Sequence, residues 1–178
     1  YPGFHMTSPP TEETAYAVYW PALVPSRMIE QVVHVAGSEI VIPPVIPPAV
    51  PPDLTIAESS LPPVPAGRSV RAPLGRVAGA RSGDKGGNAN VGVWARTPEA
   101  YAWLCSYLSA ERLSQLLPEA RGLEVERYLL PNLLAVNFVI QRLLGEGVSS
   151  STRSDPQAKS LGEYLRAKVV DVPEALLG

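Results

Sequence analysis

The densest cluster of polar residues suited to chemistry lies between positions 80 and 90. Its three glycines, Gly83, Gly86 and Gly87, permit positive φ angles and close approach of the backbone to a ligand. The amides of such a segment, together with Arg81 and Lys85, are groups that bind a phosphate or a carboxylate. The candidate anion-binding residues of this segment are Arg81, Ser82, Gly83, Asp84, Lys85, Gly86, Gly87, Asn88 and Asn90.

Other chemistries fit this segment less well. The glycine spacing matches neither the phosphate loop of nucleotide hydrolases nor the dinucleotide-binding fingerprint. Asp84, Asn88 and Asn90 lack the spaced carboxylates and the final glutamate of a calcium loop, so we expect no metal ion. Lys85 is a poor Schiff-base candidate, because the adjacent Asp84 favours the charged ammonium form. The competing interpretation is a polar hairpin whose Asp and Asn side chains bond their own backbone.

Two asparagines outside this cluster, Asn132 and Asn137, bracket the turn and strand after Pro131. Turn and sheet-edge hydrogen bonds explain such residues, but both could also reach the sheet end that presents the glycine-rich segment. We therefore add them to the candidate binding residues. The one cysteine, Cys105, lies a single position from the apolar face of a predicted helix, so we expect a core thiol rather than a nucleophile.

The segments that would position these residues alternate between strand and helix. A helix is predicted to start at Thr97-Pro98-Glu99, which supplies an N-cap, a proline at the first helical position and an acid in the first turn. Ser109 caps a further helical segment that runs to Pro118, and a second helix is predicted after Asp155-Pro156. Strands are predicted at 74–81, 90–96, 124–130, 135–144 and 168–172.

Without the strand at 74–81, this order is β-α-β-β-α-β, which is the order of a ferredoxin-like sandwich. We therefore predict an α+β fold for residues 67–178, with two helices on one face of an antiparallel sheet. In this fold, a glycine-rich loop joins the strands at 74–81 and 90–96.

Residues 1–66 differ from the rest of the chain in composition. Fourteen of the 20 prolines lie in residues 1–65, which hold six acidic residues and one basic residue, whereas residues 66–178 hold 14 basic and 11 acidic residues. Alternating apolar residues within 28–42 predict a β-hairpin that turns at Gly37-Ser38. The prolines of 43–52 predict an extended polyproline-type strap, whose apolar residues we expect to lie against a surface.

Composition narrows the classes of function. A net charge of −2 on 178 residues, with no aromatic residues among the basic ones of 68–85, argues against a nucleic-acid partner. No run reaches the ~18 apolar residues of a membrane span, so we expect no membrane partner. A single cysteine cannot form an internal disulfide, so we expect a reducing compartment, the cytoplasm. The chain begins with Tyr1 rather than Met, and we expect it to be a piece of a longer protein.

The segments 80–86, 90–93 and 95–96 closely resemble the signature ARSGDKG…NIGV.AR of the acyclic terpene utilisation protein A (AtuA) family. The pieces at 130–132, 137–138 and 155–159 resemble the same region, so the resemblance spans residues 74–173. It implies a carboxy-terminal ferredoxin-like domain that follows a larger domain. Residues 1–66 resemble the end of that larger domain. One departure is Gly87, where the family often has Asp, which weakens any paired-acid or metal role.

The resemblance implies a part in the breakdown of acyclic terpenes and branched acids as coenzyme A thioesters. We expect the basic segment to bind an anionic group of an acid or acyl-CoA ligand. No cofactor is predicted apart from a CoA thioester as substrate, and no catalytic residue is assigned. The expected protein partners are the larger N-terminal domain or a partner chain, and further copies of this chain in a homo-oligomer. The alternative is a non-catalytic assembly domain whose chemistry lies in a separate or missing domain.

Overall fold

The computed structural model describes residues 12, 15–18, 20–44 and 61–178. The described residues between 20 and 59 form one compact unit and the other described residues form a second. The first unit is a β-hairpin of β1 (Gln31–Val35) and β2 (Ser38–Ile42). Ala36 and Gly37 both have positive φ, as a two-residue hairpin turn requires. The hairpin predicted within 28–42 is thus confirmed, with its turn one residue earlier. Most of the predicted proline strap, residues 45–52, lies outside the described residues.

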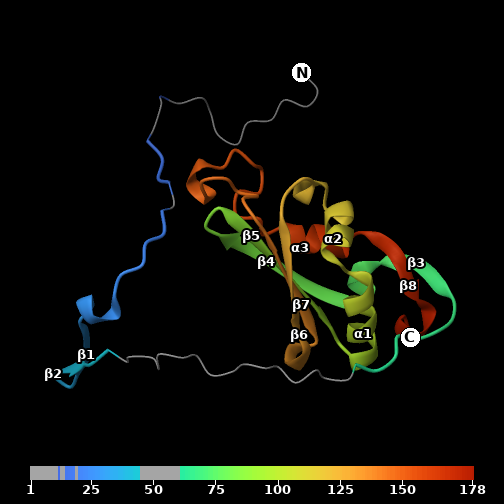
Figure 1. Cartoon of the computed structure of the whole chain (residues 1–178), viewed down its shortest axis with the longest axis horizontal. Helices are drawn as coiled ribbons and strands as arrows, with labels where there is room; N and C mark the ends of the chain where they lie inside the picture. The colour runs from blue at the N-terminus through green and yellow to red at the C-terminus, as the bar shows by residue number, and fades with distance from the viewer. Residues whose placement is uncertain (1–11, 13–14, 19, 45–60) are drawn as a thin grey trace. The chain divides into compact units, whose positions relative to one another are not determined.

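The second unit is built around a four-stranded antiparallel sheet. Its strands are β4 (Ala78–Lys85), β5 (Asn88–Ala95), β6 (Val125–Leu130) and β7 (Ala135–Ile140), in the spatial order β4-β5-β7-β6. The three helices are α1 (Pro98–Tyr107), α2 (Ala110–Leu116) and α3 (Leu161–Arg166). Figure 1 shows them gathered on one side of the sheet. The α+β class and the ferredoxin-like layering are therefore confirmed.

The start of α1 follows the predicted local chemistry. Thr97 Oγ1 accepts a hydrogen bond from the Ala100 amide at 3.2 Å, and Pro98 occupies the first helical position. Ser109 Oγ accepts from the Arg112 amide at 3.1 Å and caps α2 in the same way. Two caps divide the predicted helical stretch into two helices, which allows it to bend around the sheet.

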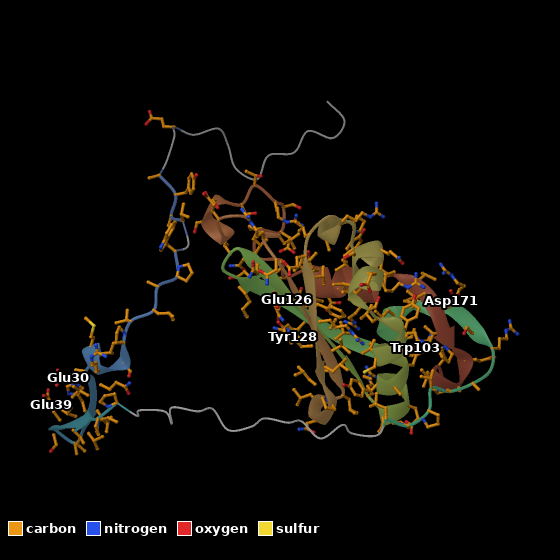
Figure 2. The ribbon with its side chains drawn as sticks, viewed as in Figure 1. Glu30, Glu39, Trp103, Glu126, Tyr128 and Asp171 are labelled. Carbon is orange, nitrogen blue, oxygen red and sulfur yellow. The ribbon has the colours of Figure 1, made fainter. Side chains whose placement is uncertain are left out.

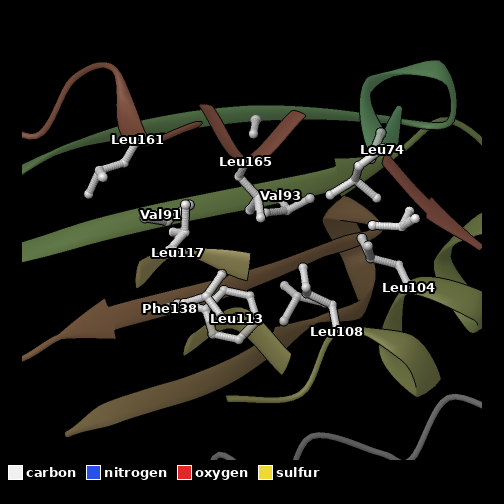
Figure 3. Close-up of a cluster of buried hydrophobic side chains, with 14 of the residues drawn as sticks. Leu74, Val91, Val93, Leu104, Leu108, Leu113, Leu117, Phe138, Leu161 and Leu165 are labelled. Atoms are coloured by element: carbon white, nitrogen blue, oxygen red, sulfur yellow. The ribbon is translucent and has the colours of Figure 1, made fainter. Parts of the chain in front are cut away.

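The core lies between the helices and one face of the sheet. Because side chains alternate along a strand, only every second residue of β5 and β7 faces the helices, and these residues are fully buried. Figure 3 shows this layer against the leucines of the helices. The principal sheet residues are Ala89, Val91, Val93, Val136, Phe138 and Ile140, and the principal helical or flanking residues are Leu104, Leu108, Leu113, Leu117, Leu161 and Leu165.

The edge of the sheet differs from the predicted order. The final strand, β8 (Val169–Pro173), pairs with β3 (Ser69–Pro73) in a separate two-stranded sheet. Its expected place beside β5 is taken by β4, the strand that the β-α-β-β-α-β order leaves out. A two-residue turn at Gly86-Gly87 pairs β4 with β5 locally, and this short connection fills the edge that a later strand would otherwise occupy.

The second predicted helix begins later than expected. The Asp155 carboxylate accepts hydrogen bonds from the Lys159 amide at 3.0 Å and from the Ser160 amide at 2.8 Å, and α3 starts only at Leu161. Ala158 has a φ of 52°, which is outside the right-handed helical region. Asp155 therefore closes a turn that leads into the helix rather than capping the helix itself.

Gly162 allows α3 to lie directly on the backbone of β4. A Cβ at this position would come within 3.2 Å of the Arg81 backbone nitrogen and carbonyl carbon. We expect Gly162→Val to lower the free energy of unfolding by about 1–3 kcal/mol, because the helix must move off the strand. Chemical denaturation measures this. The exposed Glu163→Ala on the same helix is the control and should change stability by less than about 0.5 kcal/mol; equal stability of both variants would contradict the close packing.

Candidate functional site

The predicted glycine-rich loop is almost entirely strand. The register runs without interruption from Ala78 opposite Ala95 to Lys85 opposite Asn88, so only Gly86 and Gly87 form the turn. The expectation of an eight-residue loop at 82–89 is therefore wrong. Strand pairing depends on backbone hydrogen bonds, which polar and glycine residues also provide. The consequence is that neighbouring candidate residues lie on opposite faces of the sheet rather than converging in one loop.

Ser82 faces the helices. It lies opposite the buried Val91, and its Oγ donates to the Lys159 carbonyl at 3.1 Å and accepts from the Gly162 amide at 2.8 Å. Asp84 is half-buried on the same side of β4. Ser82 thus joins β4 to the start of α3, and its hydrogen-bonding capacity serves the fold.

The turn is packed against the segment after β7. The Leu144 amide donates to the Gly87 carbonyl at 2.9 Å, and Asn88 Oδ1 accepts from the Arg142 amide at 2.8 Å. A Cβ on Gly87 would overlap the carbonyl oxygen of Gly145. This contact accounts for glycine at position 87, and Gly86, with a φ of 64°, supplies the left-handed residue of the turn.

The remaining candidates lie on the sheet face turned away from the helices, which we call the open face. It carries Arg81, Gly83 and Lys85 of β4, Asn90 of β5 and Asn137 of β7. Asn90 Nδ2 donates to Asn137 Oδ1 and, at 3.5 Å, to the Phe138 carbonyl. The structure therefore brings these five predicted site residues, together with Asn88 opposite Lys85, onto one surface, where the Asn90 side chain donates a hydrogen bond to that of Asn137.

Arg81 and Lys85 flank an empty position on β4. A Cβ built on Gly83, which lies between them, meets no atom within 4 Å. Within the described ranges the ion pairs are His34–Glu39, Arg71–Asp171 and Arg166–Glu163, so neither Arg81 nor Lys85 has an acidic partner there. Lys85 Nζ donates only to the adjacent Asp84 carbonyl, at 3.3 Å. Two exposed cations with a gap between them remain on this edge.

Asn132 is far from the turn. It lies in the short 3₁₀ segment Pro131–Leu133 that links β6 to β7. The register places the start of β7 opposite Trp94 and its end opposite Ala89. Asn132 is therefore at the opposite end of the sheet from Gly86-Gly87, and the expectation that it reaches that end is wrong. The cause is the antiparallel direction of β7, which carries residues just before it away from the turn.

The open face also carries an acidic edge that the sequence analysis did not identify. Glu126 and Tyr128 of β6 lie next to each other along the strand (Figure 2), and the Glu126 carboxylate accepts hydrogen bonds from Tyr128 Oη and Gln141 Nε2. These donors hold the pKa of Glu126 below its usual value, Tyr128 having the larger effect. The signal was available: Glu126 and Tyr128 are two positions apart in a predicted strand, so they share one face of it.

Three further observations concern metal binding, Cys105 and membrane spans. Across the residues that the structure describes, no group of three or more His, Cys, Asp or Glu side chains is placed to hold a metal ion. Cys105 is half-buried against the core, and its carbonyl accepts from the Arg127 guanidinium. None of the helices in the described ranges is both long and apolar enough to cross a membrane.

The two glycines at 83 and 87 form a matched pair for substitution. We expect Gly87→Ala to destabilise the domain by about 1–3 kcal/mol, because the new methyl group overlaps the Gly145 carbonyl. Gly83→Ala should leave stability within about 0.5 kcal/mol, or raise it slightly by restricting the unfolded chain. Thermal and urea denaturation of the two variants measure the difference, and equal losses would contradict the packing of the turn.

Tyr128 reports on the acidic edge. Its hydrogen bond to Glu126 raises the pKa of the phenol above its usual value, because the neutral phenol donates to the carboxylate. In Glu126→Gln the pKa of Tyr128 should fall towards that of a free tyrosine, as followed by NMR of ring-labelled tyrosine during an alkaline titration. Tyr16, elsewhere in the chain, serves as an internal control; an unchanged Tyr128 titration would show that the hydrogen bond does not form.

Comparison with known proteins agrees with this architecture. The model of the AtuA ferredoxin-like domain matches residues 72–171, a range that contains the whole four-stranded sheet and all three helices. No curated protein and no solved structure matches the chain. The matched range includes the whole hairpin of β4 and β5. The chain therefore belongs to the AtuA ferredoxin-like domain family.

Proposed function

We propose that this domain binds an anionic group through Arg81 and Lys85 within a catabolic protein of acyclic terpene or branched-acid breakdown. The ligand class is the phosphate or carboxylate of an acyl-CoA or acid substrate. The link to this catabolism comes from the motif resemblance, and the link to an anion comes from the charges on β4. The alternative is a non-catalytic assembly domain whose chemistry lies in a separate or missing domain.

The single observation that carries the binding role is the gap over Gly83 between two cations that have no acidic partner among the described residues. Alternate residues of a strand are ~6.8 Å apart, so each cation is anchored about one such step from Gly83. An anion seated over the glycine can then accept charge-assisted hydrogen bonds from both side chains. The missing Cβ removes the group that would keep the anion away from the backbone.

The neighbouring residues support this geometry. Asn90 lies directly opposite Gly83, and its amide is held by Asn137 and the Phe138 carbonyl. Ser82, on the other face, joins the same strand to α3. The strand that presents Arg81 and Lys85 is thus fixed from both sides, so that little ordering of the backbone is needed when an anion binds.

Calorimetric titration with coenzyme A tests this role. We expect Arg81→Ala and Lys85→Ala each to weaken binding by roughly ten-fold, which corresponds to one lost charged hydrogen bond. Arg121→Ala removes an exposed positive charge that lies outside the sheet and should leave the affinity within about two-fold. Equal affinities for all four proteins, or no binding by the unmodified chain, would overturn the proposed function.

A further inference from the structure

We infer that the open face of the four-stranded sheet is a docking surface for a second copy of this chain. The two copies are related by a two-fold axis that runs parallel to the strands between β5 and β7. This arrangement goes beyond the small-ligand function, although it uses the same two cations. It follows from the order of the strands and from which residues share each row across the sheet.

The open face has exposed apolar residues with no cover in the described chain. Trp94 is 38% exposed, Tyr128 is 47% exposed and Leu130 is 39% exposed, whereas the opposite face of the two central strands, β5 and β7, is buried under the helices. Tyrosine, tryptophan and arginine are the residue types enriched at protein interfaces. A surface with all three on a rigid sheet has the composition of an interface.

Charge selects a second copy as the occupant. The positive residues Arg81 and Lys85 lie on β4, at one edge of the face. The negative residue Glu126 lies on β6, at the other edge, and Glu124 directly precedes that strand. A two-fold axis along the strands places β4 of each copy over β6 of the other. Both edges then meet an opposite charge, and the contact occurs twice because the interface is isologous.

The residues that this axis brings together are also complementary in size. In one row, Arg81 is in register with Gly92, then Asn137 and Tyr128. The axis places Arg81 against Tyr128 of the other copy, and Gly92 against Asn137. Each large residue in these pairs meets one that leaves room or can stack on it, as face-to-face sheet packing requires.

The next row completes the match. Gly83 is in register with Asn90, then Val139 and Glu126. The same axis puts the Glu126 carboxylate of the second copy over Gly83, in the gap between Arg81 and Lys85. Within its own chain this carboxylate is already oriented by Tyr128 and Gln141, so it is presented as a fixed anion.

The apolar end of the face pairs in the same way. A Cβ on Gly79 would overlap the Trp94 ring, so the indole lies across β4 at that row. Leu130, in the same row on β6, faces this indole across the axis. The contact between tryptophan and leucine occurs twice and supplies apolar burial that the charged edges lack.

The area of the open face determines how strongly two copies are expected to associate. Four strands ~4.8 Å apart and about seven residues long cover roughly 19 by 24 Å, or about 450 Å² per copy. This is at the small end of specific interfaces, so we expect a reversible pair with a dissociation constant in the micromolar range. Since the second copy and a free anion would occupy the same gap, each should weaken the binding of the other.

Sedimentation equilibrium of the whole chain at low to high micromolar concentrations tests the inference. Arg81→Glu and Glu126→Arg should each weaken self-association by roughly ten-fold or more, because each places like charges together. The double variant with both changes should restore it to within a few-fold of the unmodified chain, since the axis brings position 126 of one copy beside position 81 of the other, in the adjacent row. Arg121→Glu, with the same change of charge outside the face, is the control.

A second variant covers the case in which a charge reversal disturbs the fold. A Cβ at position 83 meets no atom within 4 Å, and the rest of a leucine side chain would extend into the seat of the Glu126 carboxylate, so Gly83→Leu should fold normally and self-associate weakly. Loss in the single variants with recovery in the double variant supports the inference. A chain that stays monomeric, or a pair that none of these changes affects, overturns it.

The outcome is separable from that of the small-ligand function. A chain that binds coenzyme A through Arg81 but does not self-associate overturns the inference alone. Self-association that obeys the charge swap, without affinity for coenzyme A, overturns the ligand function alone and identifies Glu126 of a second copy as the anion. If both occur, added coenzyme A should shift the equilibrium towards the monomer.

Discussion

The two-residue turn at Gly86-Gly87 determines the register on which the rest of the site depends. A shift of one residue between β4 and β5 would turn every side chain of β4 to the other face. Ser82 would then leave α3, and Arg81 would point into the core. The contacts of Gly87 with Leu144 and Gly145 fix the turn from outside the hairpin, so the register is set at its end as well as by the buried alanines at its start.

This register divides the motif at 80–86 into two functions. Ala80 and Ser82 serve the layer of helices, one by burial and the other by hydrogen bonds to the start of α3. Arg81, Gly83 and Lys85 make no comparable contribution to packing. A charged residue pair with a glycine between them, on a face that the core does not need, is retained at some cost in strand propensity. The proposed binding of an anionic group would account for this arrangement.

Most of the fold could be predicted because it is local. The caps at Thr97 and Ser109 and the alternation in 124–130 specify their elements without distant contacts. The extent of β4 and the pairing of β8 could not be predicted in this way, since they depend on which of two strands distant from each other in sequence pairs with the edge of β5. The site was predicted as one loop because its polar residues are adjacent in sequence. Their separation onto two faces, and the contribution of Glu126, require the register between strands.

The basic and acidic edges of the open face explain why a small anion and a second copy are related possibilities. A carboxylate on β6 and a carboxylate or phosphate of a ligand offer the same group to Arg81 and Lys85. The carboxylate of a second copy binds more favourably because two associated copies form this contact twice. A free ligand competes through its higher concentration. If both proposals hold, the ratio of ligand to protein decides which one occupies the gap over Gly83, and assembly of the domain would be coupled to the supply of the anionic ligand.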